Sequence, residues 1–204
     1  MDMAGMDPWI DSWNLMAYDY AGSWDSTSGH QANIYSNPQN PVATKFSTEQ
    51  AVRDYIVAGI SSSKIMMGLP LYGRSFEATS GIGQTYNGVG PGTIQSGVWL
   101  YKDLPRAGAT EVYDNTAKAS YSYDPSSQEL ISYDNVASAI QKSQYLLNKG
   151  LGGAVFWEAS GDATGAQSLV HTLATQMGNL DSSQNLLSYP ASQYDNIRNN
   201  MPGS

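Results

Sequence analysis

Three segments of the chain share one pattern of apolar and polar positions. Residues 13–19, 65–74 and 152–158 are short apolar runs that become polar or aromatic only at their carboxyl ends. This pattern is typical of a buried strand in a parallel sheet whose exit end faces a ligand. The three ends are Tyr18-Asp19, Tyr72-Gly73-Arg74 and Trp157-Glu158. A phenol, a carboxylate, a guanidinium and an indole together suit the binding of a sugar.

A helix is predicted between the first two strands. Ser47 and Gln50 have the spacing of a capping box, and apolar residues then recur at helical spacing up to Ile60. Before the helix, residues 21–46 contain glycines and prolines that predict a long loop. Strand, loop, helix and strand in this order form a parallel crossover unit. Such units build βα-barrels, whose active sites lie at the carboxyl ends of the strands.

The chain changes character after Arg74. Residues 75–98 are rich in Gly and Thr, and residues 99–133 predict short antiparallel strands. Two helices are expected around the third strand, one capped by Asp134 and stopped by Gly150, the other over residues 166–177. The predicted organisation is a barrel segment (1–74), a small α+β insertion domain (75–133), the last barrel strand with flanking helices (134–178), and a polar tail that packs in extended form (179–204).

The composition excludes several classes of partner. The 204 residues carry a net charge of −8, and charged residues make up 14%, against roughly 25% in an average soluble domain. Nucleic acid is not an expected partner because phosphate binding needs a basic face. No membrane association is expected either, since no segment approaches the ~20 apolar residues of a membrane-spanning helix. Low charge with many Tyr, Ser and Asn favours an extracellular location, although the first twenty residues show no secretory signal.

Neither a metal site nor a cofactor is predicted. The chain has no cysteine, and its two histidines, His30 and His171, lie far apart in sequence without a partner at metal-ligand spacing. His171 is expected to be exposed or on the flank of the last helix. Residues 81–86 superficially resemble a dinucleotide-binding loop, but Tyr86 takes the place of its third glycine.

Each strand end also has an ordinary structural interpretation when it is taken alone. A strand that ends in Tyr-Asp before a loop is typical of a wall with a capping carboxylate. Tyr72 and Arg74 are two residues apart and emerge on one face, as expected of a surface pair that neutralises a nearby acid. Trp157 alone is typical of a core residue, because aromatic side chains mostly pack.

In combination, the three ends resemble the chitinases of glycoside hydrolase family 18. The resemblance spans nearly the whole chain from Trp13 and is carried in order by Met16-Ala17-Tyr18-Asp19 with Gly22, by Met67-Gly68-Leu69-Pro70-Leu71-Tyr72-Gly73-Arg74, and by Gly152-Gly153-Ala154-Val155-Phe156-Trp157-Glu158. The family is an eight-stranded βα-barrel that hydrolyses β-1,4-linked N-acetylglucosamine with retention. Its nucleophile is the acetamido carbonyl of the substrate, an exception to the two-carboxylate scheme. The resemblance therefore implies chitin or chitooligosaccharides as the ligand, with no cofactor.

The resemblance also implies a role for each polar side chain at the strand ends. Tyr18 would be the phenol that holds the acetamido group, and Asp19 the acid that contacts and positions the sugar. Tyr72 and Arg74 would line the same subsite, and Arg74 would pair with Asp19.

Three further side chains would contact sugar through their apolar surfaces. Met16 and Trp157 would form the floor of the reacting subsite, and Trp24 would stack under the neighbouring sugar. Stacking on indole buries the C–H groups of a sugar face without loss of the hydroxyl hydrogen bonds.

The chain departs from the family at the general acid. That acid is the last residue of an Asp-x-x-Asp-x-Asp-x-Glu block, and no such block occurs in the sequence. The family places the block upstream of the Met-x-Tyr-Asp strand. The fold expected here is therefore α/β, namely the C-terminal three βα units of a TIM-type (β/α)8 barrel with a small insertion domain, and the first five strands would precede Met1.

The missing block leaves three functions open. The first is a portion of a secreted chitinase that is inactive alone. The second is a lectin-like protein that binds chitooligosaccharides without catalysis. The third is a half-barrel that assembles with a separate N-terminal half or with itself, because three parallel strands cannot close a barrel and leave their edges exposed.

Overall fold

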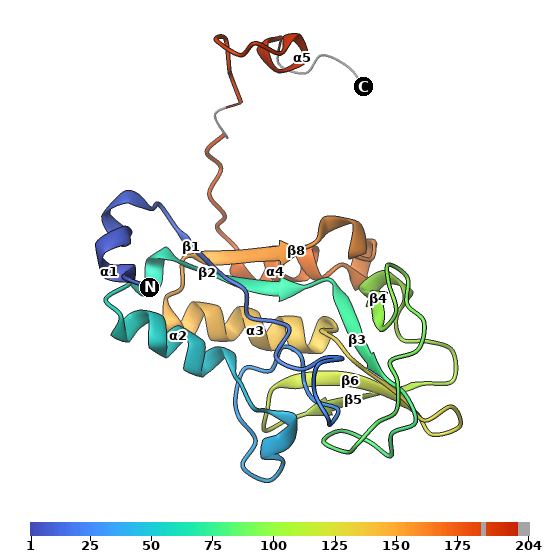
Figure 1. Ribbon diagram of the computed structural model, residues 1–204. Coiled ribbons are helices and arrows are strands. Elements are labelled where there is room, and N and C mark those ends of the chain that lie inside the picture. Colours follow the sequence, from blue (N-terminus) through green and yellow to red (C-terminus); the bar gives the residue numbers. More distant parts are fainter. Residues whose placement is uncertain (185–186, 200–204) are drawn as a thin grey trace.

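The computed structural model describes residues 1–184 and 187–199, and it contains two sheets that share one body (Figure 1). The first sheet is parallel, in the order β1-β2-β8. Its strands are β1 (Trp13–Leu15), β2 (Ile65–Pro70) and β8 (Gly153–Trp157). The predicted parallel arrangement of the three segments is thus confirmed.

The two faces of the parallel sheet are buried to different extents. Ile65, Met67 and Leu69 are fully buried on β2, and Figure 1 shows helices beneath that sheet. These helices are α2 (Thr48–Val57), α3 (Val136–Lys149) and α4 (Leu169–Met177). The opposite face carries Asn14 and Trp157, which are exposed, and Val155, which is half-buried. The central strand β2 is buried along nearly all its length, as predicted, whereas the ends of its neighbours are open, as expected of strands that do not close a barrel.

The second sheet is antiparallel and has five strands in the order β4-β3-β7-β6-β5. They are β3 (Tyr72–Phe76), β4 (Val98–Leu100), β5 (Thr110–Asp114), β6 (Ala119–Asp124) and β7 (Glu129–Ser132). All residues of 75–133 are described, and among them the only helical element is the 3-10 turn Tyr101–Asp103.

The segment 65–74 is two strands rather than the single strand that was expected. The Leu71 N–H donates to the Trp157 carbonyl at 2.7 Å, whereas the Leu71 carbonyl accepts from the Tyr101 N–H at 2.9 Å. The backbone thus changes hydrogen-bonding partners at Leu71 and passes from one sheet to the other. As a result, the predicted boundary at residue 74 falls inside β3.

The structure bears out two of the helix ends predicted from the sequence and corrects a third. The Ser47 side chain accepts from the Gln50 N–H at the start of α2, which is one half of the predicted capping box, while the Gln50 side chain donates to Asp54 instead of completing the box. Gly150, in the left-handed conformation, ends α3. The start of α3 is capped by Asn135, not by Asp134. Asp134 is instead buried, where its carboxylate accepts from Lys142 at 2.6 Å. The buried ammonium competes for this carboxylate, and the next residue takes over the cap.

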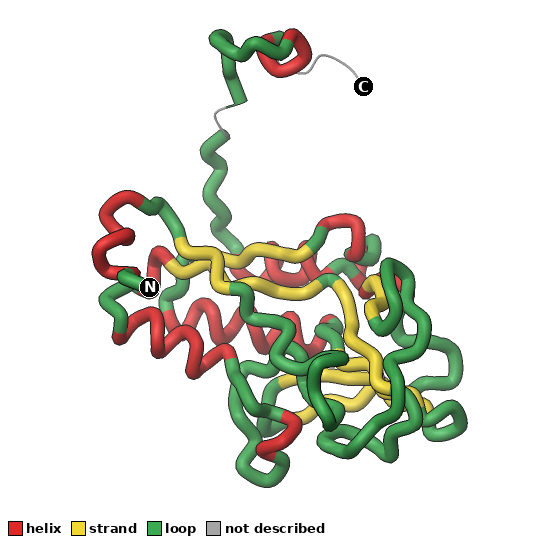
Figure 2. The backbone as a smooth tube through the Cα atoms, viewed as in Figure 1, coloured by secondary structure: helices red, strands yellow, loops and turns green. Residues whose placement is uncertain are grey.

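The remaining elements are short. They are the helices α1 (Met3–Met6) and α5 (Asp195–Arg198), and 3-10 turns at Asp7–Trp9, Pro41–Ala43, Ser62–Lys64, Ala159–Gly161 and Gly165–Gln167. The tail was expected to pack, yet its described residues after Gly178 are mostly exposed and lead away from the body (Figure 2). No helix in the described part of the chain is long and apolar enough to span a membrane.

Candidate functional site

The end of β1 is held against β2 by a close backbone approach. A Cβ on Gly68 would lie 2.6 Å from the Leu15 carbonyl oxygen and 2.8 Å from Cε1 of Tyr18. Only glycine leaves room there for the Tyr18 ring to lie over β2. The next residue, Asp19, has a φ of 62°, in the left-handed region that Asp tolerates better than most residues. This conformation lets the Asp19 carboxylate reach the start of β3.

Asp19 is the centre of a polar cluster at the junction of the two sheets. One of its oxygens, Oδ1, accepts from the Tyr72 hydroxyl at 2.5 Å and from Arg74 Nε at 2.6 Å. Tyr72 and Arg74 emerge on the same face of β3, as the two-residue period predicts. The Tyr18 ring meets the Tyr72 ring edge-on, with centroids 6.2 Å apart. The expected pairing of Arg74 with Asp19 is present in the structure.

The cluster keeps its phenols protonated and its guanidinium charged. Burial, and then the Asp19 carboxylate, raise the pKa of Tyr18. Burial and the hydrogen bond to Asp19 raise the pKa of Tyr72 well above its usual range. For Arg74, burial opposes the charge, but the hydrogen bond and the charge of Asp19 outweigh it, so its pKa is raised as well. At neutral pH the site therefore offers hydroxyl donors and a fixed ion pair.

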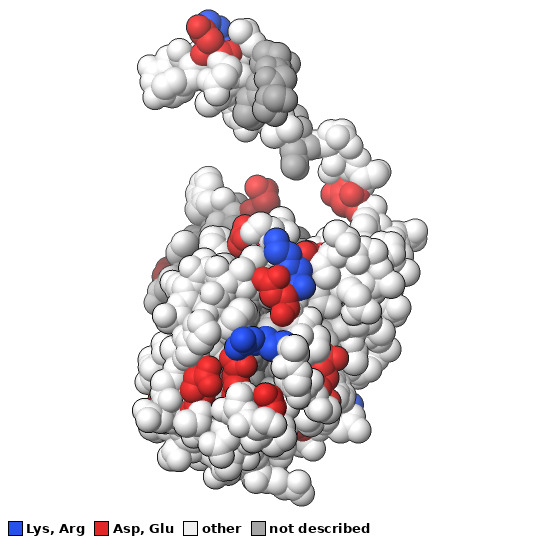
Figure 3. All heavy atoms as spheres, turned by 90° about the vertical axis from the view of Figure 1, so that its right-hand side faces the viewer, with Lys and Arg blue, Asp and Glu red and all other residues white. Residues whose placement is uncertain are grey.

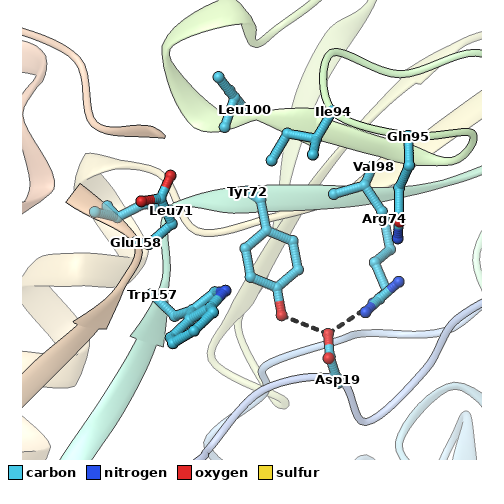
Figure 4. A pocket seen from close by; sticks show the side chains of 10 residues that line it. All are labelled: Asp19, Leu71, Tyr72, Arg74, Ile94, Gln95, Val98, Leu100, Trp157 and Glu158. Carbon is cyan, nitrogen blue, oxygen red and sulfur yellow. Dashed lines mark hydrogen bonds and ion pairs between the residues drawn. The ribbon is translucent and has the colours of Figure 1, made fainter. Parts of the chain in front are cut away.

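A cavity of about 250 Å³ opens beside this cluster (Figure 4). The pairing of β3 with β4 places Tyr72 opposite Leu100 and Arg74 opposite Val98. Residues directly opposite each other share one face of a sheet, so the polar pair and the apolar pair line the cavity together. The other lining residues are Asp19, Leu71, Ile94, Gln95, Trp157 and Glu158.

The expected stacking residues lie around this cavity in different ways. Trp157 lines it and is 62% exposed, a high value for an indole. Met16 is 70% exposed and does not line the cavity. Trp24 also lies outside the lining, and its ring centroid is 4.6 Å from Cζ of Arg74. The cluster therefore joins Trp24 to the site through Arg74, whereas no contact of Met16 with the cavity is found among the described residues.

The sequence did not reveal one wall of the cavity. Ile94, Gln95 and Val98 come from the loop and strand that follow β3, in a stretch rich in glycine. Their place depends on the register of β3 with β4, which no local pattern announces. Glu158 was part of a recognised strand end, but its place in the cavity lining was not predicted. Its carboxylate accepts a hydrogen bond from the Ser160 hydroxyl.

The arrangement suits a neutral polar ligand with an apolar face. No hydrogen bond of the Tyr18 hydroxyl or of Asp19 Oδ2 is found within the described residues, so both are available to a ligand. The surface towards which β2 and β8 point is largely uncharged, with basic and acidic side chains in a few groups (Figure 3). No group of three metal-ligating side chains occurs in the part of the chain that the structure describes.

Comparison with known proteins gives the family. Residues 1–162 match glycosyl hydrolases family 18. The chain belongs to this family. It is 55% identical over 192 residues to Chitinase 1 of Aphanocladium album and 53% identical to Endochitinase 1 of Metarhizium robertsii. Each alignment covers 94% of this chain but 45% of the relative, so the chain spans less than half the length of these family members.

Solved structures of the family share the fold. Chitinase ChiA74 from Bacillus thuringiensis is 31% identical with a TM-score of 0.77, over 86% of this chain and 33% of that one. The family 18 chitinase of Cycas revoluta, solved in complex with allosamidin, is 29% identical with a TM-score of 0.71, over 86% of this chain and 48% of that one. The same plant enzyme has also been solved in complex with (GlcNAc)3.

Proposed function

We propose that this chain is the sugar-holding portion of a chitinase that hydrolyses β-1,4-linked N-acetylglucosamine polymers. The observation that carries the proposal is the Asp19–Tyr72–Arg74 cluster beside the exposed face of Trp157, in one cavity at the carboxyl ends of parallel strands. Tyr18 holds the acetamido group and Asp19 contacts the sugar. The proposed function is supported by the family membership of the chain and by its sequence identity to named chitinases over nearly its whole length.

The proposed chemistry is substrate-assisted and retains configuration. The acetamido carbonyl attacks the anomeric carbon while a general acid protonates the leaving oxygen. Met16 and Trp157 form the floor of the reacting subsite, Tyr72 and Arg74 line it, and Trp24 stacks under the next sugar. The general-acid block does not occur in these 204 residues, and loss of a general acid costs ~10² to 10⁴ in rate. The chain by itself is therefore proposed to be inactive.

Turnover of a fluorogenic chitobioside tests this proposal. We expect none above the uncatalysed rate from the chain alone. Turnover should appear when the chain is mixed with the part of Chitinase 1 from Aphanocladium album that lies outside the matched 192 residues. Robust turnover by the chain alone would overturn the account of the missing acid. Saturable binding of chitooligosaccharide without turnover in either arm favours the lectin-like alternative.

The open face of the parallel sheet supports a further proposal about assembly. The three strands correspond to the C-terminal βα units of a (β/α)8 barrel, and a separate N-terminal half or a second copy would cover their exposed edges and the half-buried Val155. We expect the isolated chain to self-associate or to aggregate. Sedimentation as a stable, soluble monomer would contradict this expectation. We also propose that the protein is secreted, because its charged content of 14% is low.

A further inference from the structure

The loop between β3 and β4 ends in a tight turn at the site. Residues 93–97 fold back so that Gln95 bridges Val98, and Ile94 and Gln95 both line the cavity. Figure 4 shows these two side chains above Tyr72 and Arg74, on the wall that lies away from Asp19. The turn therefore faces any ring that rests against the Asp19 cluster.

Hydrogen bonds fix this turn from several directions. The Val98 N–H donates to the Gln95 carbonyl at 2.9 Å, and the Thr93 N–H donates to the Val98 carbonyl at 2.9 Å. The Thr93 hydroxyl donates to Asp103 at 2.7 Å. A Cβ on Gly92 would lie 2.1 Å from the Gln95 carbonyl oxygen, so the close approach requires glycine. The turn also joins β3, because the Ser75 N–H donates to the Gly97 carbonyl at 3.0 Å.

The tip of this rigid turn carries an amide beside an apolar surface. The Gln95 side chain is exposed, and no hydrogen bond of its carboxamide is found within the described residues. A carboxamide can donate and accept at once. Beside it lie the side chains of Ile94, Val98 and Leu100. An acetamido group has the matching parts, an amide that can donate and accept and a methyl group that gains by leaving water.

We propose that the Ile94–Gln95 turn recognises the acetamido group of a sugar beside the reacting ring, and so sets the preference for N-acetylated over deacetylated polymer. The inference rests on the proposed function. Successive rings of a β-1,4-linked polymer are turned over, so their acetamido groups point to opposite walls. A ring whose acetamido group meets Tyr18, which does not line the cavity, thus has a neighbour whose group points away from Tyr18, and the turn, which does line the cavity, offers a partner for that group.

The charges of the cavity oppose a preference for N-acetylated polymer. Asp19 and Glu158 both line the cavity, whereas Arg74 is the only basic residue in that lining. The Asp19–Arg74 pair leaves Glu158 without a basic partner among these lining residues. An amino sugar without its acetyl group carries an ammonium, which a carboxylate attracts. Charge alone would therefore favour binding of the deacetylated polymer, and the Ile94–Gln95 turn acts against that tendency.

Binding of two matched ligands to variants of the 204-residue chain tests the proposal. Intrinsic tryptophan fluorescence gives the Kd for chitotetraose and for its fully deacetylated counterpart. Gln95→Ala should weaken binding of chitotetraose about tenfold, because a neutral hydrogen bond contributes about that factor. The same change should alter the Kd for the deacetylated ligand by less than about twofold. Ile94→Ala should show the same selective loss, about fivefold, through the lost methyl contact.

The matched control is Gln176→Ala, because Gln176 is an exposed glutamine on α4 that does not line the cavity. It should change neither Kd. Equal loss for both ligands in Gln95→Ala, or no loss for either, overturns the recognition of the acetamido group while the wild-type chain still binds. A wild-type chain that binds no chitotetraose overturns the proposed function and this inference with it. Circular dichroism confirms that each variant folds.

Discussion

The dipeptide Tyr-Asp occurs five times in this chain, and two copies have opposite surroundings. At Tyr18-Asp19, the carboxylate sits at a cavity and pairs with Arg74, and the side chains of both partners keep some contact with solvent. At Tyr133-Asp134, both residues are buried, and Asp134 pairs with Lys142 at 2.6 Å with side-chain exposures of 2% and 1%. The same two residue types thus belong to a partly exposed cluster at a cavity in one place and to the core in the other.

Burial explains why the two pairs should fail differently when they are broken. Removal of one partner of a buried pair leaves an uncompensated charge in the interior, whereas a partly exposed charge regains water. The Ser138 hydroxyl also donates to Asp134 at 3.1 Å, so the buried carboxylate has a second partner. In contrast, one oxygen of Asp19 accepts both protein donors. The inner pair, Asp134–Lys142, therefore serves stability, whereas the outer pair, Asp19–Arg74, leaves one carboxylate oxygen of Asp19 for a ligand.

The largest expected effect is on stability, from Lys142→Met. Asp134 would remain buried without its cation, which should lower the free energy of unfolding by about 3–5 kcal/mol. Urea denaturation followed by circular dichroism measures the change. The double variant Asp134→Asn/Lys142→Met should recover much of the loss. The control is Lys149→Ala, which should cost at most about 1 kcal/mol, because Lys149 is on the same helix as Lys142 but forms an exposed pair with Glu49 of α2. A similar cost for both lysines would erase the distinction between the two regions.

The next effect is on binding, from Arg74→Ala. The variant removes the charged hydrogen bond by which Arg74 holds Asp19, the residue proposed to contact the sugar. The affinity for chitotetraose should therefore fall about 30-fold, within the range of a charged hydrogen bond. The free energy of unfolding should change by at most about 1 kcal/mol, because Asp19 can be solvated. Arg74→Lys should recover only part of the affinity, since an ammonium lacks the planar fork of the guanidinium. Loss of stability without loss of binding would make the outer pair as structural as the inner one.

The smallest effect concerns pH. The pKa of Tyr18 is raised above its ordinary value of 10.0 by burial and by Asp19, so its hydroxyl remains a donor in mildly alkaline solution. The affinity for chitotetraose should therefore change less than about twofold between roughly pH 7.5 and pH 9.5. Asp19→Asn removes the second cause, and the fall in affinity should then begin at lower pH. A wild-type affinity that already falls with a midpoint below pH 10 would show that the phenol is not held in this way.

The sequence predicted the contacts of the Asp19 cluster better than the elements around it. The alternation of residues along the strands was enough to place Tyr72 and Arg74 on one face, and the pairing of Arg74 with Asp19 followed from the family resemblance. Asp134 was assigned to a helix cap because a local pattern cannot see Lys142, one packing partner eight residues away. The change of sheet at Leu71 was missed because both of its backbone partners, Trp157 and Tyr101, are distant in sequence.

By itself the sequence determined the periodic elements and the chemistry at their ends, since apolar periodicity, caps and side-chain types are local properties. Only the tertiary structure decided which Tyr-Asp copy is open and which is buried, and which loop faces the site. Those outcomes depend on strand register and on solvent exclusion, which arise when segments far apart in the chain come together. Gln95 shows the difference: its carboxamide is ordinary in the sequence, and it lines the cavity only because β4 pairs with β3.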